Sequence, residues 1–319
     1  MGGGPPEQEG SVRRAEILMP PSGWRDIDSD PNARPNVLAR ADSLNRAYRL
    51  ESRTREEIIT DLCRDKKVVD IGCVDHEASK ITEERWLHGK ILKVASECLG
   101  IDNDASGIDA MRRQGFNIQL VDITGDLSGL RELGPFDVVV AGEVIEHLGN
   151  PESLLLAARE LLGPQGKLIL TTPNPFAPWR AVAGMRRQVW ENVDHVTLLF
   201  PSGMVELAER CGMRVTMVTT VGGRRLFMTI PGSIRVLAGM WGRALLRRPK
   251  GTGPLGISYP AGYVSPFVAF YIRRLAPLGQ LNETSVYVLE PDPECTGIDG
   301  GTVAQSGSGA ATRHPELPS

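Results

Sequence analysis

The chain has 319 residues, of which 41% are hydrophobic, so it can bury one large α/β core with additions. Its formal net charge of -3 gives no general attraction to nucleic acid, and no nucleic-acid partner is expected. The 5 cysteines are scattered without a C-x-x-C spacing, which argues against a disulfide framework or a zinc knuckle. Together with the absence of an apolar signal region, this indicates a reduced, cytoplasmic protein.

Composition divides the chain into one domain and two tails. Residues 1–35 are rich in Gly, Pro and charge, and residues 291–319 are rich in Gly, Ser, Thr and Ala, so both are expected to be disordered. The predicted domain covers residues 36–290, with a helical lead-in at 36–64 and helical insertions at 176–195 and 223–283.

Buried strands and amphipathic helices alternate through the first half of this domain. Strands are expected at 66–73, 97–102, 117–121, 136–141 and 167–172, and helices at 81–95, 105–115 and 151–162. A helix at 202–211 and strands at 213–220 and 284–290 follow. This alternation predicts an α/β fold with a doubly wound parallel sheet.

Residues 136–148 combine a strand with a group of ionisable side chains. The β-branched run breaks at Gly142, and ligands in open α/β sheets bind at such carboxyl ends. If Glu143 begins a helix, Glu146 and His147 share its face. Two carboxylates about 4 Å apart repel by roughly 4 kcal/mol at an effective dielectric near 20. A shared proton, a basic partner or a divalent cation would relieve that repulsion.

These motifs, taken in order, resemble class I S-adenosylmethionine-dependent methyltransferases, and in particular the ubiquinone-biosynthesis O-methyltransferase group. The segments that carry the resemblance are 68–73, 99–102, Asp122, 136–148 and 167–175. The resemblance implies a Rossmann-like sheet of seven strands with the last strand antiparallel, and S-adenosylmethionine as the cofactor.

The family pattern also implies cofactor contacts. Asp70 and Gly72 would flank the methionine end, Asp102 would hold the ribose hydroxyls, and Asp122 would face the adenine amino group. The full set implied to bind the cofactor is Asp70, Gly72, Cys73, Asp102, Asn103, Asp122, Ile123 and Gly142. The alternative for Asp102 and Asp122 is that each only caps a helix or a turn.

The first loop departs from the family pattern. Val74 and His76 stand where the family usually has its second and third glycines, and Asp75 adds negative charge. Side chains there crowd the approach to a cofactor. His76, Trp86 and His88 are candidates for the pocket mouth, although packing explains His88 as well.

Glu143, Glu146, His147 and His195 are similar to the metal quartet of small-RNA 2'-O-methyltransferases. Such oxygen and imidazole ligands fit Mg, Mn, Fe, Co or Zn, and the metal would lower the pKa of a substrate hydroxyl. Without a metal, His147 would pack under the helix, or His147 or His195 would serve as a general base.

We therefore expect a methyltransferase that acts on a small-molecule hydroxyl of a diol, catechol or sugar, assisted by a divalent metal. One alternative is a metal-independent enzyme for a lipid-like or quinone precursor, and another is a non-catalytic cofactor-binding module. The insertions mix aromatic and basic side chains, which is compatible with peripheral membrane contact, a lid or a homodimer surface.

Overall fold

The computed structural model describes residues 24–74, 86–177, 180, 191–222 and 282–293. Its helices, with 3-10 turns marked η, are η1 (Trp24–Asp26), α1 (Arg34–Ala47), α2 (Arg55–Cys63), α3 (Leu87–Leu92), α4 (Ala105–Arg113), α5 (Ser128–Leu133), η3 (Ile145–His147), α6 (Pro151–Leu161) and α8 (Pro201–Arg210). Its strands are β1 (Lys67–Ile71), β2 (Glu97–Asp102), β3 (Ile118–Leu120), β4 (Phe136–Gly142), β5 (Leu162–Pro173), β6 (Met213–Val221) and β7 (Thr284–Pro291). No helix in these ranges is long and apolar enough to cross a membrane.

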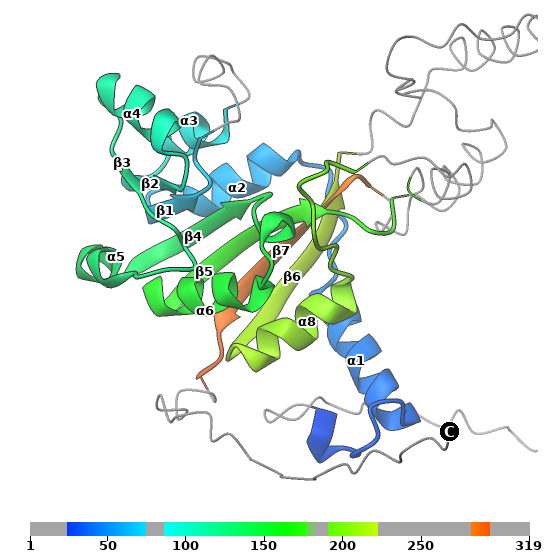
Figure 1. Cartoon of the computed structure of the whole chain (residues 1–319). Coiled ribbons are helices and arrows are strands. Elements are labelled where there is room, and N and C mark those ends of the chain that lie inside the picture. Colours follow the sequence, from blue (N-terminus) through cyan, green and yellow to red (C-terminus); the bar gives the residue numbers. More distant parts are fainter. Residues whose placement is uncertain (1–23, 75–85, 178–179, 181–190, 223–281, 294–319) are drawn as a thin grey trace, which may run out of the picture.

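The strands form one seven-stranded sheet in the order β3-β2-β1-β4-β5-β7-β6 (Figure 1). Strands β1 to β5 pair in parallel, whereas β7 runs antiparallel to both β5 and β6. The predicted doubly wound α/β sheet of seven strands, with its last strand antiparallel, is therefore confirmed.

Alternate strand residues face two layers of helices, as expected for a sheet that is buried on both sides. Val68, Val138 and Ile169 point to one side, where they form a buried cluster with Ile59 and Cys63 of α2. Nearly continuous apolar strands are the sequence signature of this arrangement.

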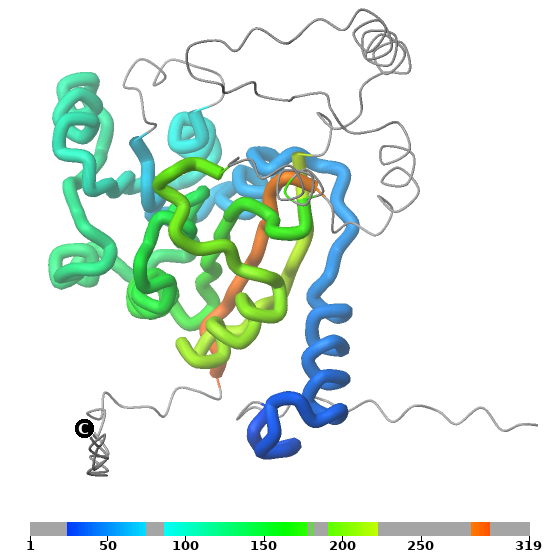
Figure 2. The backbone as a smooth tube through the Cα atoms, turned by 45° about the vertical axis from the view of Figure 1, so that its right-hand side comes forward, coloured from blue at the N-terminus to red at the C-terminus, as the bar shows by residue number. Residues whose placement is uncertain are grey.

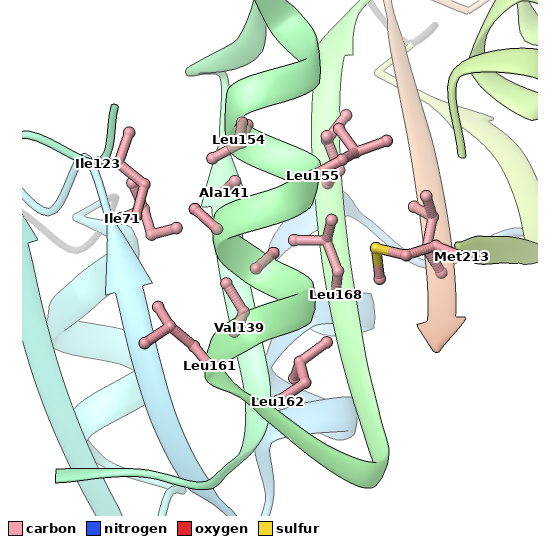
Figure 3. Close-up of a cluster of buried hydrophobic side chains, with 14 of the residues drawn as sticks. Ile71, Ile123, Val139, Ala141, Leu154, Leu155, Leu161, Leu162, Leu168 and Met213 are labelled. Carbon is pink, nitrogen blue, oxygen red and sulfur yellow. The ribbon is translucent and has the colours of Figure 1, made fainter. Parts of the chain in front are cut away.

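On the opposite face, α6 lies across β4 and β5 (Figures 1 and 3). Leu154, Leu155 and Leu161 of α6 share one buried cluster with Val139 and Leu168 of these strands. Removing a buried leucine of this kind usually costs about 2 to 5 kcal/mol of stability. This packing fixes the central strands and therefore the positions of the loops that leave their carboxyl ends.

Helix α1 stands at the β6 end of the sheet, far from α3 and α4 (Figure 2). Arg40 of α1 donates to the carboxylates of Glu206 and Glu209 on α8, at 2.7 and 2.9 Å. Trp24 of η1 also donates to Glu206, at 2.9 Å. Residues 24–35, which were predicted to belong to a disordered tail, thus include η1 and the start of α1.

Several boundaries differ from the predicted ones. The helix expected at 81–95 is observed only as α3, and residues 81–85 lie outside the described part. Strand β5 starts at Leu162, five positions before the predicted start, because Leu162 pairs with Phe136 across an irregular register. Most of the predicted insertion 223–283 also lies outside the described residues, which resume at Asn282.

Candidate functional site

A cavity of about 880 Å³ lies at the carboxyl ends of β1, β2 and β4. The strand order reverses between the neighbours β1 and β4, and such switch points are where α/β sheets bind ligands. Every residue predicted to bind cofactor or metal lines this cavity: Asp70, Gly72, Cys73, Asp102, Asn103, Asp122, Ile123, Gly142, Glu143, Glu146, His147 and His195. The structure brings them together, and their contacts with a ligand stay predictions.

The turn after β1 needs a glycine at its first position. Gly72 has a φ of +74°, and a Cβ there would lie 2.7 Å from Cγ2 of Val144. Its N–H donates to the carbonyl of Ile101 at 2.9 Å, and the N–H of Val74 donates to Oδ2 of Asp102 at 3.0 Å. The backbone of this turn is therefore held against the end of β2.

The two strand-end aspartates already make backbone contacts. Asp102 accepts from the N–H groups of Val74 and Asp104, which leaves further lone pairs for a ligand. Asp122 accepts from the N–H and the hydroxyl of Thr124 at 2.9 and 2.7 Å, and these bonds lower the pKa of its carboxyl. Both residues thus have the turn-capping contacts considered as their alternative role, and both still line the cavity.

Glu143 does not begin a helix, so the expectation of one shared helical face is wrong. Its φ is +62°, a left-handed conformation that is rare outside glycine, and only the short turn η3 follows. The Glu143 N–H donates to the carbonyl of Thr171 at 2.9 Å, while Oε1 accepts from Thr284 Oγ1 at 3.3 Å. Arg55 Nη1 lies 3.9 Å from the same oxygen.

Glu146 is almost completely buried, with 1% of its surface exposed. Thr172 Oγ1 donates to its Oε2 at 3.0 Å, and its Oε1 has no hydrogen-bond partner among the described residues. Burial raises the pKa of Glu146 to about 7, and the neighbouring Glu143 carboxylate acts in the same direction. A proton, one of the three sources of relief considered above, can therefore offset the repulsion between the carboxylates.

Two histidines complete the group around Glu146. The ring centroids of His147 and His195 are 4.8 Å apart, and ligand atoms of the three residues all lie within 4.8 Å of one another. Nδ1 of His147 is 3.0 Å from Oδ2 of Asp194, and Nδ1 of His195 is 3.4 Å from Oε2 of Glu191. Each histidine therefore has one nitrogen held by a carboxylate and one left for a ligand or a proton.

The family profile described as "Methyltransferase domain" matches residues 43–218, which is more than half of the chain. The chain belongs to the methyltransferase domain family. The ubiquinone biosynthesis O-methyltransferase of Aeromonas salmonicida (strain A449) is 26% identical over 156 residues, which cover 47% of this chain and 63% of that protein. Its counterpart in Paraburkholderia xenovorans (strain LB400) is 28% identical over 109 residues, which cover 34% of this chain and 45% of that protein. The chain spans less than two thirds of the length of either relative.

Solved structures of methyltransferases are also similar to this chain. A SAM-dependent methyltransferase from Archaeoglobus fulgidus matches with a TM-score of 0.42 at 14% identity, and the match covers 74% of this chain and 94% of the other chain. The small RNA methyltransferase HEN1 has a TM-score of 0.43 at 15% identity and covers 75% of this chain and 25% of its own.

Sequence reasoning about this methyltransferase domain missed Arg55. A capping box between Thr54 and Glu57 fixes the start of α2, and Arg55, the first residue of this helix, lines the cavity. Arg55 lies against Gly142, because a Cβ added to this glycine would be 2.7 Å from Nη2 of Arg55. The Nε of Arg55 has no hydrogen-bond partner in the described chain. No local pattern marks an arginine that reaches from one element over another.

Other lining residues were predicted in part. Trp86 and His88 line the cavity as proposed, and His88 is also buried, which is the packing role considered as its alternative. Asp194 was not predicted as a site residue, yet it is the partner of His147. His76 lies outside the described residues.

Proposed function

We propose that the chain transfers the methyl group of S-adenosylmethionine to a hydroxyl oxygen of a small molecule. Membership of the methyltransferase domain family supports methyl transfer, and the named relatives support oxygen as the acceptor atom. The observation that carries the proposal is the group formed by Glu146, His147 and His195 in the same cavity as Asp70 and Asp102.

The side of the cavity at the ends of β1 and β2 suits the cofactor. Asp102 stands where a carboxylate can accept from both ribose hydroxyls, as in dinucleotide-binding folds. At the methionine end, the ammonium group would face Asp70, and the carboxylate would meet the guanidinium of Arg55. Opposite charges at the two positions fix the direction of the amino-acid part of the cofactor.

The opposite side has donors that fit a divalent cation. Glu146 offers a buried oxygen that has no hydrogen-bond partner in the described part of the chain, and His147 and His195 offer imidazole nitrogens. One carboxylate and two imidazoles form a ligand set typical of Fe, Co, Zn or Mn. A cation held there would lower the pKa of a substrate hydroxyl and orient it. Glu143, the fourth predicted ligand, is outside this group and is instead beside Thr284 and Arg55.

Neighbouring residues hold this group in place. Thr172 directs the Glu146 carboxylate, and Asp194 orients the His147 ring. The N–H groups of Val196 and Thr197 donate to the Glu146 carbonyl at 2.9 and 3.2 Å. This preorganisation favours transfer because an acceptor would be aligned with the methyl group on binding.

A second candidate is metal-independent transfer to an acceptor with an apolar substituent. The 3.0 Å contact between His147 and Asp194 matches a general base and the carboxylate that orients it. Large apolar side chains are exposed around the segment that contributes His195, with Val193 at 95% exposure. Phe176 and Phe200 are also exposed and are in edge-to-face contact with each other.

The decisive experiment measures transfer of labelled methyl from S-adenosylmethionine to catechols, vicinal diols and matched monohydroxy phenols. The chelated enzyme and the enzyme resupplied with individual divalent cations are compared, and bound metal is determined by elemental analysis. Activity that requires both a cation and two adjacent hydroxyls supports the metal-assisted reaction. Full activity of the chelated, metal-free enzyme on a monohydroxy acceptor supports the general-base reaction, and no transfer to any hydroxyl refutes both.

A further inference from the structure

Asp70 and His88 form a buried contact that the proposed reaction leaves unexplained. Asp70 lies near the end of β1 and His88 lies in α3, and His88 Nδ1 is 2.9 Å from Asp70 Oδ2. The two side chains are 3% and 0% exposed. A buried carboxylate requires compensation, and this histidine is the only partner of the Asp70 side chain among the described residues.

The neighbouring Trp86 contacts the turn that follows β1. Its indole N–H donates to the carbonyl of Cys73 at 3.0 Å, and its ring lies 5.3 Å from the His88 ring. Trp86, His88, Asp70 and Cys73 all line the cavity. Two side chains from one short segment therefore contact both the end of β1 and the turn that follows it.

This arrangement compensates for the departure of the first loop from the family pattern. The loop keeps Gly72 but has Val74 where a glycine is usual. Val74 lies so close to Gly107 that a Cβ added to this glycine would be 2.4 Å from Cγ1 of Val74. With fewer glycines, the backbone cannot adjust freely around a ligand. Side chains that anchor Asp70 and Cys73 would define the shape of the loop instead.

The contact also indicates which proton His88 carries. Nδ1 faces the Asp70 carboxylate and acts as the donor, whereas Nε2 is buried and has no partner among the described residues. A buried N–H without an acceptor is costly, so the neutral Nδ1–H form fits this site best. A neutral histidine leaves the negative charge of Asp70 available to a cationic ligand.

We infer that His88 and Trp86 are positioning residues for the amino-acid part of S-adenosylmethionine. His88 holds the Asp70 carboxylate toward the cofactor ammonium group, and Trp86 holds the Cys73 carbonyl at the same end of the cavity. The inference rests on the proposed function, because it assumes that S-adenosylmethionine occupies this cavity. It assigns these residues no contact with the transferred methyl group.

The test is calorimetric titration of the full chain with S-adenosylmethionine and with 5'-methylthioadenosine, which lacks the amino-acid part. His88→Asn keeps a donor nitrogen at the Nδ1 position, whereas His88→Gln moves its amide to the Nε2 position and His88→Leu has none. We expect His88→Asn to bind S-adenosylmethionine within about threefold of the wild type. The Gln and Leu variants, and Trp86→Phe, should bind it about tenfold or more weakly. All variants should bind 5'-methylthioadenosine like the wild type.

The control is Phe116→Leu. Phe116 packs edge-to-face against Trp86 at 5.1 Å but does not line the cavity, so its loss should lower the Tm and leave both affinities unchanged. If the Asn and Gln variants bind S-adenosylmethionine with equal affinity, the inference is overturned, even if His88→Leu fails to fold. Variants that bind S-adenosylmethionine and 5'-methylthioadenosine equally more weakly than the wild type would also overturn it. A wild type that binds 5'-methylthioadenosine but not S-adenosylmethionine would also overturn it. A wild type that binds neither refutes the proposed function, and the inference falls with it.

Discussion

Replacing Glu146 by glutamine should stabilise the protein at neutral and alkaline pH, but not at acidic pH. Burial raises the pKa of Glu146 from 4.5 to about 7 in the folded protein. The folded state therefore holds the proton more tightly than the unfolded chain, and the stability of the wild type falls as the pH rises from about 4.5 to 7. Glutamine is neutral at every pH and keeps an acceptor for Thr172.

The size of the effect follows from the two pKa values. The interval from 4.5 to about 7, at about 1.36 kcal/mol per pH unit, corresponds to roughly 3 kcal/mol. Most of the loss of wild-type stability occurs below pH 7. We therefore expect the difference in unfolding free energy between Glu146→Gln and wild type to grow by roughly that amount between pH 4 and pH 8.

Urea unfolding at both pH values, with chelator present, measures this difference. The chelator is needed because a bound cation would compensate the ionised carboxylate and mask its cost. Glu132→Gln on the exposed surface of α5 is the matched control, and its effect should not depend on pH. A difference for Glu146→Gln that stays constant between the two pH values would refute the reasoning, because it would mean that the Glu146 carboxylate ionises without a burial penalty.

Three further predictions test other parts of the structure. Asp102→Ala should weaken S-adenosylmethionine binding by well over tenfold in calorimetry, since charge-assisted hydrogen bonds contribute roughly 1.5 to 3 kcal/mol, and unchanged affinity would exclude its ribose role. Arg40→Ala should destabilise the fold by about 2 kcal/mol, because it leaves the partly buried carboxylate of Glu209 without a hydrogen-bond partner in the described chain, whereas Glu206 keeps Trp24 and Arg210. Arg46→Ala at an exposed pair should cost less than about 0.5 kcal/mol, and equal costs would contradict this. Divalent cations should raise the Tm of the wild type but not of His147→Ala or His195→Ala, and a rise in all three would place the cation elsewhere.

The sequence predicted the strand ends well because a strand that is buried on both faces appears in the sequence as a continuous apolar run. Apolar runs that stop at Asp102 and Gly142 show where the chain emerges from the core, and the carboxyl ends of parallel strands meet at one edge. The number of strands and the antiparallel last strand came from the family resemblance, and the order of the strands was not predicted. Periodicity alone does not specify which strands are neighbours.

Other features depend on contacts between distant segments and have no local pattern. Glu143 adopts a left-handed conformation through bonds to β5 and β7, so its helical spacing to Glu146 was misleading. The start of β5 at Leu162 depends on pairing with β4, which overrides the Gly and Pro that follow it. The pairing of Asp70 with His88 likewise joins two elements whose sequences do not indicate it.

The strand order also explains why one cavity can serve both reactants. Asp102 ends β2, Asp70 lies near the end of β1, and Glu146 follows β4 on the far side of β1, so the residues proposed to bind the cofactor and the acceptor lie in sequence along one edge of the sheet. His195 comes from a later segment, which the Val196 and Thr197 N–H groups tie to the Glu146 carbonyl. Because these bonds are made by the backbone, we expect them to hold the segment of His195 beside Glu146 whether or not a cation is bound. If the reaction is metal-assisted, removal of the cation should abolish methyl transfer without unfolding the site, in contrast to structural metals whose binding drives folding.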